Sequence, residues 1–336
     1  MPQNKETTVF DKNIVFSVVA PVYNEEEAIH IYIEKTLKTL KEMGVNYELI
    51  LVNDGSTDNT LEILKTSAQK EQCVRVIELS RNFGREIAMT AGLEHSVGDY
   101  VVIMDSDMQD PPELIPDLLQ KLLTDELDIV YAARQSRNGE TFLKKLSSKL
   151  FYRVASSMTG LNIPQNAGDF RVFSRKALNS ILTMREHNRY LKMLYAYVGY
   201  RVGSVAFDRP ERLAGESSYN WSSLLGAATD AIFAFSNKPL RIMSLVSITI
   251  SSCLFVYACY IFVTKIMGAN VVEGWTSLML LMSFMFSILF VFLALISEYI
   301  SRILIECKNR PLYYIRDETG NAVFDIPEML QNEKKD

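Results

Sequence analysis

Acidic and amide side chains alternate along one short segment, DSDMQD at 105–110. The segment follows the apolar run YVVIM at 100–104, which has the composition of a buried strand. Carboxylate and amide oxygens such as those of Asp105, Asp107 and Gln109 are the hard ligands that Mg²⁺ or Mn²⁺ prefers when it is held against a diphosphate. An isolated Asp-x-Asp is more often a solvated acidic turn, so the metal interpretation depends on what surrounds the segment.

The loops after the first two predicted strands offer related chemistry. The first strand runs into PVYNE at 21–25, where Tyr23 offers an aromatic face and Glu25 an acceptor. The second runs into NDGSTD at 53–58, which contains Asp54. Acids at a helix start can serve the helix dipole or cap the helix, and capping alone accounts for the end of the second loop. It accounts poorly for Asp54, which we expect to accept a hydrogen bond from a nucleotide's base or ribose.

Strands and helices alternate along the first part of the chain. Short apolar runs predict strands at 14–20, 49–52, 74–79, 100–104 and 127–131. Helical spacing predicts helices between them at 29–40, 57–68, 85–96 and 112–123. This alternation predicts an α/β fold with a doubly wound, mostly parallel sheet, whose carboxyl edge is where such sheets bind ligands. No GxGxxG follows the first strand, which argues against a dinucleotide-dependent dehydrogenase.

Composition excludes several classes of protein. A net charge of -5 argues against a nucleic-acid partner, which would favour a basic chain. The 4 cysteines have no CxxC spacing, and with only 3 histidines a zinc site or a disulfide framework is not expected. Residues 1–12 lack the apolar core of a signal peptide, so we expect the large domain to remain in the cytoplasm.

Two long uncharged runs lie near the end of the chain, at 242–264 and 276–297. Each is long enough to cross a bilayer core of about 30 Å. Basic residues flank the outer ends of the pair, while the connection between the two runs contains only one basic residue, Lys265. The positive-inside rule therefore predicts a transmembrane hairpin with both termini in the cytoplasm.

Two further segments mix apolar and polar side chains. Residues 142–158 predict a basic amphipathic helix, which is either an ordinary surface helix or one that rests on an anionic leaflet. Residues 221–235 predict an interfacial helix that leads into the membrane, and this helix could pair between chains in a homo-oligomer. We therefore expect a cytoplasmic α/β domain at 1–219, an interfacial helix at 220–239, a membrane hairpin at 240–300 and a cytoplasmic tail at 301–336.

The order of five motifs, PVYNEE, NDGSTD, LSRNFG, DSDMQD and GDFRVFSR, resembles the family 2 glycosyltransferases of GT-A fold. Within that family it is similar to the polyisoprenyl-phosphate glycosyltransferases, the group of the bactoprenol glucosyltransferases and dolichol-phosphate mannose synthase. The resemblance implies a sugar nucleotide donor, a Mg²⁺ or Mn²⁺ ion, and a polyprenyl (undecaprenyl) phosphate acceptor in the lipid bilayer of the bacterial plasma membrane. UDP-glucose is the first expectation for the donor, and GDP-mannose is the alternative.

The resemblance also assigns residues. The nucleoside-binding positions are Pro21, Tyr23, Glu25, Asp54 and Asp105. The metal and diphosphate positions are Asp105, Asp107 and Gln109, with Asp107 the expected direct ligand. Arg134 matches the position that meets the acceptor phosphate, and Asp169 and Arg171 lie in the loop that faces the donor sugar. The positions near the diphosphate are Arg212, Gly215 and Ser217. Similar sequences often have Lys after that serine, whereas this chain has Ser218, so any phosphate contact from that lysine is missing.

The expected reaction is one inverting displacement at the anomeric carbon, with the lipid phosphate as nucleophile. A phosphate monoester, with a second pKa of about 6, needs no strong base, so Asp169 is either a base or a contact to a sugar hydroxyl. A processive polysaccharide synthase would normally add a QxxRW motif and further membrane helices, which are absent from the sequence. A non-catalytic membrane protein that binds a nucleotide sugar, or a nucleotide-binding regulator, remains an alternative.

Overall fold

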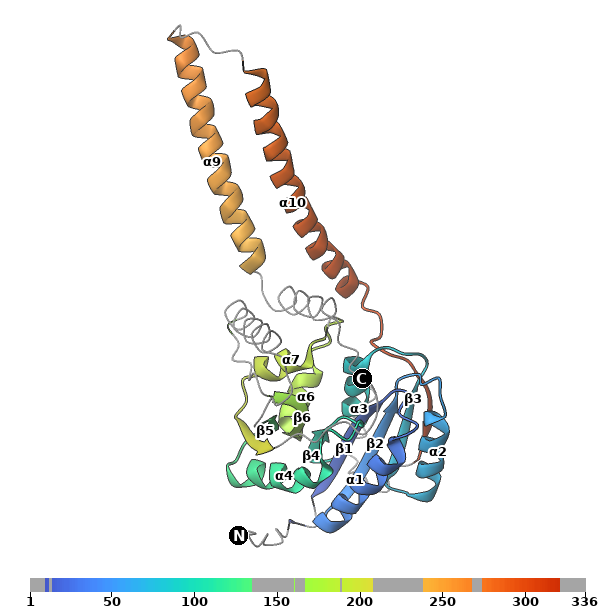
Figure 1. Cartoon of the computed structure of the whole chain (residues 1–336). Helices are drawn as coiled ribbons and strands as arrows, with labels where there is room; N and C mark the ends of the chain where they lie inside the picture. Colours follow the sequence, from blue (N-terminus) through green and yellow to red (C-terminus); the bar gives the residue numbers. More distant parts are fainter. Residues whose placement is uncertain are drawn as a thin grey trace. The chain divides into compact units, whose positions relative to one another are not determined.

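The computed structural model describes residues 10–11, 14–134, 160, 167–187, 189–207, 238–267 and 274–320 (Figure 1). The chain forms two compact units. The first consists of Met1–Arg153, Leu161–Asn220 and Pro311–Asp336, and the second of Val154–Gly160 and Trp221–Arg310. The predicted helices at 142–158 and 221–235 lie outside the described residues, as do Arg212, Gly215, Ser217 and Ser218.

The first unit is built on an 8-stranded sheet in the order β7-β5-β6-β4-β1-β2-β3-β8. The strands are β1 (Val15–Val22), β2 (Asn46–Asn53), β3 (Val74–Leu79), β4 (Tyr100–Ile103), β5 (Ile129–Arg134), β6 (Ala167–Ser174), β7 (Val202–Phe207) and β8 (Ile315–Thr319). β1 pairs in parallel with β2 and β4, β2 with β3, and β5 with β7. β6 and β8 are antiparallel to their neighbours. The expected α/β fold is confirmed, with a mixed sheet.

Helices connect these strands. They are α1 (Ile29–Met43), α2 (Thr60–Lys70), α3 (Arg85–His95), α4 (Ile115–Thr124), which follows the short 3₁₀ turn η1 (Pro112–Leu114), α6 (Arg175–Leu182) and α7 (Leu191–Tyr197). α1 buries the apolar side chains that recur at helical spacing and ends at Gly44, whose φ of 67° is the left-handed conformation of a helix C-cap. α3 lies close to the sheet, because a Cβ at Gly92 would be 2.3 Å from Cγ1 of Val19.

The five predicted strands and four predicted helices are all present, with small differences at their ends. Three strands were not anticipated. β6 carries charged residues near its start, and every second residue of the edge strand β7 is exposed. β8 has the polar sequence IRDET and lies in the segment that we expected to form a tail. None of the three has the apolar run by which the central strands were recognised.

The second unit contains two long helices, α9 (Lys238–Ile266) and α10 (Trp275–Cys307). Within the described part of the chain, one segment is long and apolar enough to cross a membrane. It is Phe284–Cys307 of α10, with a mean hydropathy of 2.1. α9 contains a shorter apolar stretch, Leu245–Tyr257. Both expected helices therefore form, while a second membrane span remains a prediction.

β8 is fixed to the sheet by side chains as well as by its strand pairing. The hydroxyl of Tyr313, just before the strand, donates to Oε2 of Glu94 on α3 at 2.6 Å. Lys65 of α2 bonds both Glu78 of β3 and Asp317 of β8, at 2.9 and 3.2 Å. Residues that follow α10 in the sequence are therefore an integral part of the first unit.

Replacing Tyr313 with Phe should loosen β8, because the ring stays while a charge-assisted hydrogen bond is lost. We expect amide hydrogen exchange across 315–319 to be about tenfold faster, since such bonds contribute about 1.5–3 kcal/mol. Tyr314→Phe is the matched control, because the side chain of Tyr314 is exposed. Equal exchange rates in the two variants would contradict a role for the Tyr313 hydroxyl.

Candidate functional site

The carboxyl ends of β4, β1 and β2 lie side by side. Val19 of β1 pairs with Ile103, and Val22 with Asn53. The loops that follow these three strands therefore begin at one edge of the sheet. β6 runs in the opposite direction, with Arg171 opposite Ile103, so its first residues reach the same edge. This topology brings most of the described candidate residues to one edge, as expected.

The first two loops are tied together by hydrogen bonds. The Thr57 amide donates to Oδ1 of Asn24 at 2.8 Å, and the Glu25 amide donates to Oγ1 of Thr60 at 2.9 Å. The ring of Tyr23 is 45% exposed and thus offers a face for stacking. The Pro21 carbonyl accepts from the Ser106 hydroxyl at 3.0 Å, which links the first loop to the acidic segment.

Asp54 is only 3% exposed and anchors the following loop. Its Oδ1 accepts from the Phe83 amide at 2.7 Å and its Oδ2 from the Gly84 amide at 3.0 Å. Burial raises the pKa of Asp54, and these two bonds act against that shift. The neighbouring Gly55 has a φ of 69°, and a Cβ there would be 2.6 Å from the Arg81 carbonyl carbon. The expected nucleoside contact from Asp54 stays a prediction.

The segment 105–110 forms a compact turn. The backbone N–H of Gln109 donates to Oδ1 of Asp107 at 3.0 Å, and the backbone N–H of Asp105 donates to Oδ2 of Asp110 at 3.2 Å. Met108, at the apex, has a φ of 62° and a buried side chain. This turn places the carboxylates of Asp105 and Asp107 and the amide of Gln109 on one short stretch of backbone.

The oxygen atoms of this turn fit a divalent ion that takes its remaining ligands from phosphate and water. Oε1 of Gln109 is buried, and in the described structure it has no hydrogen-bond partner. Across the described ranges no group of three or more His, Cys, Asp and Glu side chains could by itself hold a metal ion. Mg²⁺ bound with a nucleotide keeps several waters and needs only one or two carboxylates beside the phosphates, so Asp107 and Gln109 suit that kind of site.

Arg85, the first residue of α3, connects two carboxylates at this edge. Its Nε and Nη2 donate to Oδ1 of Asp105 at 2.9 and 2.6 Å. Its Nη1 lies 2.9 Å from Oδ2 of Asp169. The guanidinium thus joins the end of β4 to the start of β6, and its side chain is still 38% exposed.

Asp169 is buried among cations. Besides Arg85, Nζ of Lys192 lies 3.7 Å from its Oδ2. Burial would raise the pKa of Asp169, but Lys192, Arg85 and Arg171 lower it further than burial raises it, so the net pKa is depressed. Asp169 is therefore held as a carboxylate and is a weak proton acceptor. Its Oδ1 is buried and has no hydrogen-bond partner among the described residues.

Glu86, next to Arg85, is the opposite case. Its Oε2 accepts from the Leu191 amide at 3.2 Å. Burial and the nearby Asp169 raise the pKa of Glu86 to about 7. Arg171 is also buried; its guanidinium carbon lies 4.1 Å from the ring centroid of Tyr195, and its Nη2 donates to the Gly168 carbonyl at 2.5 Å.

Arg134 ends β5 at the edge of the sheet where β6 begins, close to Asp169 in the sheet register. Its Nη2 lies 3.4 Å from the position that a Cβ on Gly168 would occupy. Its Nε is buried without a hydrogen-bond partner in the part of the chain that the structure describes. A donor in this state is suited to an anionic ligand.

Arg85, Glu86 and Lys192 were not identified from the sequence. One signal was present for Arg85, because it begins a predicted helix, where the helix dipole disfavours a cation. The need for a nearby anion could have been inferred from that conflict. Lys192 gave no comparable signal, since its partner Asp169 is distant in sequence.

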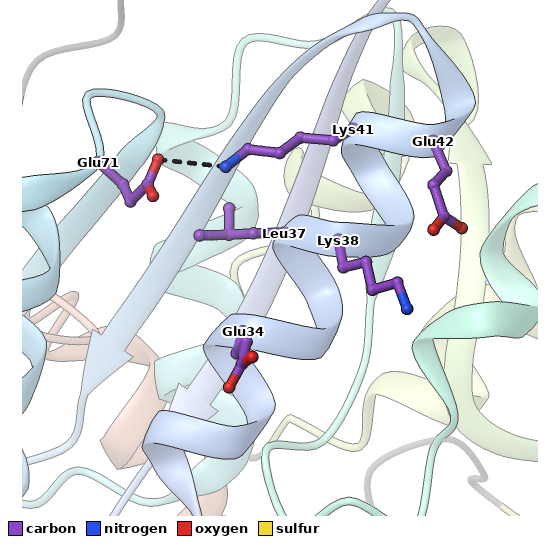
Figure 2. Close-up of a pocket in the computed structure, with 6 residues that line it drawn as sticks. All are labelled: Glu34, Leu37, Lys38, Lys41, Glu42 and Glu71. Atoms are coloured by element: carbon purple, nitrogen blue, oxygen red, sulfur yellow. Dashed lines mark ion pairs between the residues drawn. The ribbon is translucent and has the colours of Figure 1, made fainter.

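A cavity of about 470 Å³ lies elsewhere, between α1 and the turn after α2 (Figure 2). Its lining residues are Glu34, Leu37, Lys38, Lys41, Glu42 and Glu71. The ion pair between Lys41 and Glu71, 3.6 Å apart, spans it, as Figure 2 shows. These residues come from α1 and the end of α2 and include none of the predicted site residues.

Several known proteins are similar to this chain. The sequence model described as Glycosyl transferase family 2 matches residues 17–182. The chain is 39% identical to the uncharacterized glycosyltransferase YkcC of Bacillus subtilis (strain 168), over 92% of this chain and 95% of that one. It is 35% identical to the bactoprenol glucosyl transferase of Shigella phage SfV, over 90% of this chain and 98% of that one. Among solved structures, a Mycobacterium tuberculosis glucosyl-3-phosphoglycerate synthase has a TM-score of 0.46 and 23% identity, over 66% of this chain and 79% of that one.

The raised pKa of Glu86 predicts a measurable effect on stability. The pKa of Glu86 is 4.5 in the unfolded chain and about 7 in the folded protein. Between these two pH values the folded state holds a proton that the unfolded chain has lost, so the free energy of unfolding falls as the pH rises. Glu86→Gln keeps an acceptor for the Leu191 amide and removes this dependence. Between about pH 5 and pH 8, the stability of the variant relative to the wild type should increase by on the order of 1 kcal/mol.

Chemical denaturation of the detergent-solubilised protein at several pH values would measure this difference. Glu34→Gln, at an exposed position on α1, is the control and should follow the wild type at every pH. A Glu86→Gln variant that also ran parallel to the wild type would show that Glu86 is ionised like an ordinary glutamate.

Proposed function

The chain belongs to glycosyltransferase family 2, and we propose that it transfers glucose from UDP-glucose to a polyprenyl phosphate with inversion at the anomeric carbon. The observation that carries this proposal is the extent of the similarity to a bactoprenol glucosyl transferase. It covers 90% of the chain and therefore extends well beyond the family domain at 17–182, into the segment that holds the apolar helices. An acceptor that resides in the bilayer would account for similarity that includes the apolar helices.

The donor is proposed to bind at the carboxyl edge of the sheet. The exposed ring of Tyr23 is available to stack on the base, with Pro21, Glu25 and Asp54 around the nucleoside. Asp107 and Gln109 would hold Mg²⁺ or Mn²⁺. When bound, the ion supplies Lewis-acid stabilisation of charge on the departing diphosphate.

Asp169 is proposed to orient the donor sugar and not to act as the general base. Its depressed pKa makes it a poor proton acceptor, whereas its unpartnered Oδ1 within the described structure is an acceptor suited to a sugar hydroxyl. A lipid phosphate needs no such base, because a phosphate monoester with a second pKa of about 6 is largely dianionic at neutral pH. The phosphate oxygen can attack the anomeric carbon directly, and the C–O bond to the nucleoside diphosphate breaks.

Arg134 is proposed to receive the acceptor phosphate. It ends β5 beside Gly168, and its buried Nε, unpartnered among the described residues, is free to donate to a phosphate oxygen. Positive charge here would draw the lipid phosphate toward the donor sugar. Arg212, outside the described residues, is proposed to contact the leaving diphosphate.

The site should lie at the cytoplasmic face of the bacterial plasma membrane. α10 contains a segment long enough to cross the bilayer, and we propose that α9 crosses it as well, so that both termini are cytoplasmic. The lipid-linked glucose would then be a precursor for glycosylation of the cell envelope.

Cysteine labelling in sealed vesicles tests this topology. Asn270→Cys, in the connection between α9 and α10, and Ser148→Cys, in the catalytic domain, would each be made in a chain without native cysteines. A membrane-impermeant reagent should reach these two positions from opposite sides of the membrane. Labelling of both from the same side would rule out the hairpin.

Replacing Asp107 with Ala should reduce metal-dependent transfer strongly. Loss of one contact that stabilises developing charge typically costs about 10²- to 10³-fold in rate. Asp125→Ala is the matched control, because Asp125 follows α4 and pairs with Lys121 at 2.9 Å, away from the acidic turn. Turnover of Asp107→Ala within a few-fold of the wild type would exclude Asp107 as a metal ligand.

The donor and acceptor can be identified together. Purified protein would be given polyprenyl phosphate, Mn²⁺ and, in separate reactions, a panel of UDP- and GDP-sugars, with the lipid product identified by mass. We expect a polyprenyl-phosphate hexose from UDP-glucose. Product only from another donor would overturn the choice of sugar, and no lipid product from any donor would overturn the transfer reaction itself.

A further inference from the structure

Arg85 lies between two carboxylates beside the proposed metal site. Its guanidinium contacts Oδ1 of Asp105 through two nitrogens, and Oδ2 of Asp169 through the third. Two carboxylates bridged by one cation is the arrangement that a divalent ion would otherwise produce. In this structure the chain supplies that cation itself.

The bridge changes the charge of the acidic turn. Asp105 and Asp107 together would present two negative charges to a metal ion. Arg85 lies at hydrogen-bond distance from Asp105, so the positive guanidinium balances the negative charge of that carboxylate. One oxygen of Asp105 already accepts two hydrogen bonds from Arg85. Only Asp107 then contributes net negative charge from this pair, alongside the neutral amide of Gln109.

We propose that Arg85 is a resident counter-cation that keeps Asp105 from ligating the divalent ion and confines the ion to Asp107 and Gln109. This inference rests on the metal site of the proposed function and adds to it a reason for ordered binding. A site with one charged ligand binds the free ion weakly, and the donor's diphosphate supplies the missing negative charge. Metal and donor would therefore bind together. Arg85 acts here as a positioning residue, through Asp105.

The test measures Mn²⁺ binding without nucleotide, by electron paramagnetic resonance of the free ion, in the full-length protein in detergent. Arg85→Gln should bind Mn²⁺ at least about tenfold more tightly than the wild type, because a unit charge about 6 Å from a divalent ion contributes about that factor even in water. Arg85→Lys keeps the charge and should stay close to the wild type. Unchanged or weaker Mn²⁺ binding by Arg85→Gln would overturn the proposal.

Arg201→Gln is the matched control for loss of one positive charge. Arg201 lies just before β7 at the amino edge of the sheet, where it is 3.7 Å from Glu126 and from Asp128. Its Mn²⁺ affinity should remain within about twofold of the wild type, since exposed charges farther apart than the Debye length of about 10 Å are screened. A gain equal to that of Arg85→Gln would mean that net charge alone, and not the bridge to Asp105, sets the affinity.

The double variant Arg85→Gln with Asp105→Asn separates neutralisation from ligation. It replaces a neutral ion pair with two neutral amides, so it also keeps the site in charge balance if Arg85→Gln alone fails to fold. We expect Mn²⁺ affinity to return to within about threefold of the wild type. A loss of tenfold or more would show that Asp105 is a direct ligand and would overturn the proposal.

Asp107→Asn distinguishes failure of this inference from failure of the proposed metal site. Because the proposal predicts weak Mn²⁺ binding without nucleotide, this variant is measured with UDP present. Loss of Mn²⁺ binding in Asp107→Asn, with no gain in Arg85→Gln, would sink the counter-cation alone. Unchanged binding in Asp107→Asn would remove the metal site on which the inference rests.

Discussion

Carboxylates buried at the carboxyl edge of the sheet can stay ionised only because cations contact them. Asp169 is 5% exposed, and leaving such a charge without partners would cost several kcal/mol. Arg85 and Lys192 supply those partners at 2.9 and 3.7 Å. Since these cations begin α3 and α7, the requirement fixes the starts of two helices against the start of β6. The same contacts depress the pKa of Asp169, which links the packing of the unit to the chemistry proposed for the site.

α3 connects the carboxyl edge of the sheet to the edge strand β8. Its first turn holds Arg85 and its last turn holds Glu94, which accepts from the Tyr313 hydroxyl beside β8. Its middle residues are buried, and Gly92 lets the helix approach β1 closely. One short helix thus contacts both Asp105 of the acidic turn and the edge strand β8, which follows α10 in the sequence. Loss of the β8 contacts would remove support from the helix that positions Arg85.

The parts that could be predicted from sequence are those governed by local patterns. Continuous apolar runs identified the central strands, and the acids that follow them marked the carboxyl edge. Contacts between distant residues could not be read in this way. Arg85 contacts Asp169 because β6 lies antiparallel between β5 and β4, and Tyr313 contacts Glu94 because β8 pairs antiparallel with β3 at the edge of the sheet. Both strands lack a strong apolar pattern. Asp54 was predicted to be functional from its place after the second strand, but its bonds to the Phe83 and Gly84 amides depend on a close approach at Gly55 that spacing alone does not reveal.

The depressed pKa of Asp169 makes it a poor proton acceptor, and Arg134 has a buried donor without a partner among the described residues. Both observations support the proposed nucleophile, a phosphate that is already anionic. Direct attack by such a nucleophile would invert the anomeric carbon of the proposed donor, UDP-glucose, whose glycosidic bond is α. The most direct measurement is the anomeric configuration, by nuclear magnetic resonance, of the lipid formed from ¹³C-labelled UDP-glucose and polyprenyl phosphate. A β-linked glucosyl phosphate is predicted. An α-linked product, or release of free glucose without lipid product, would contradict direct displacement by the lipid phosphate.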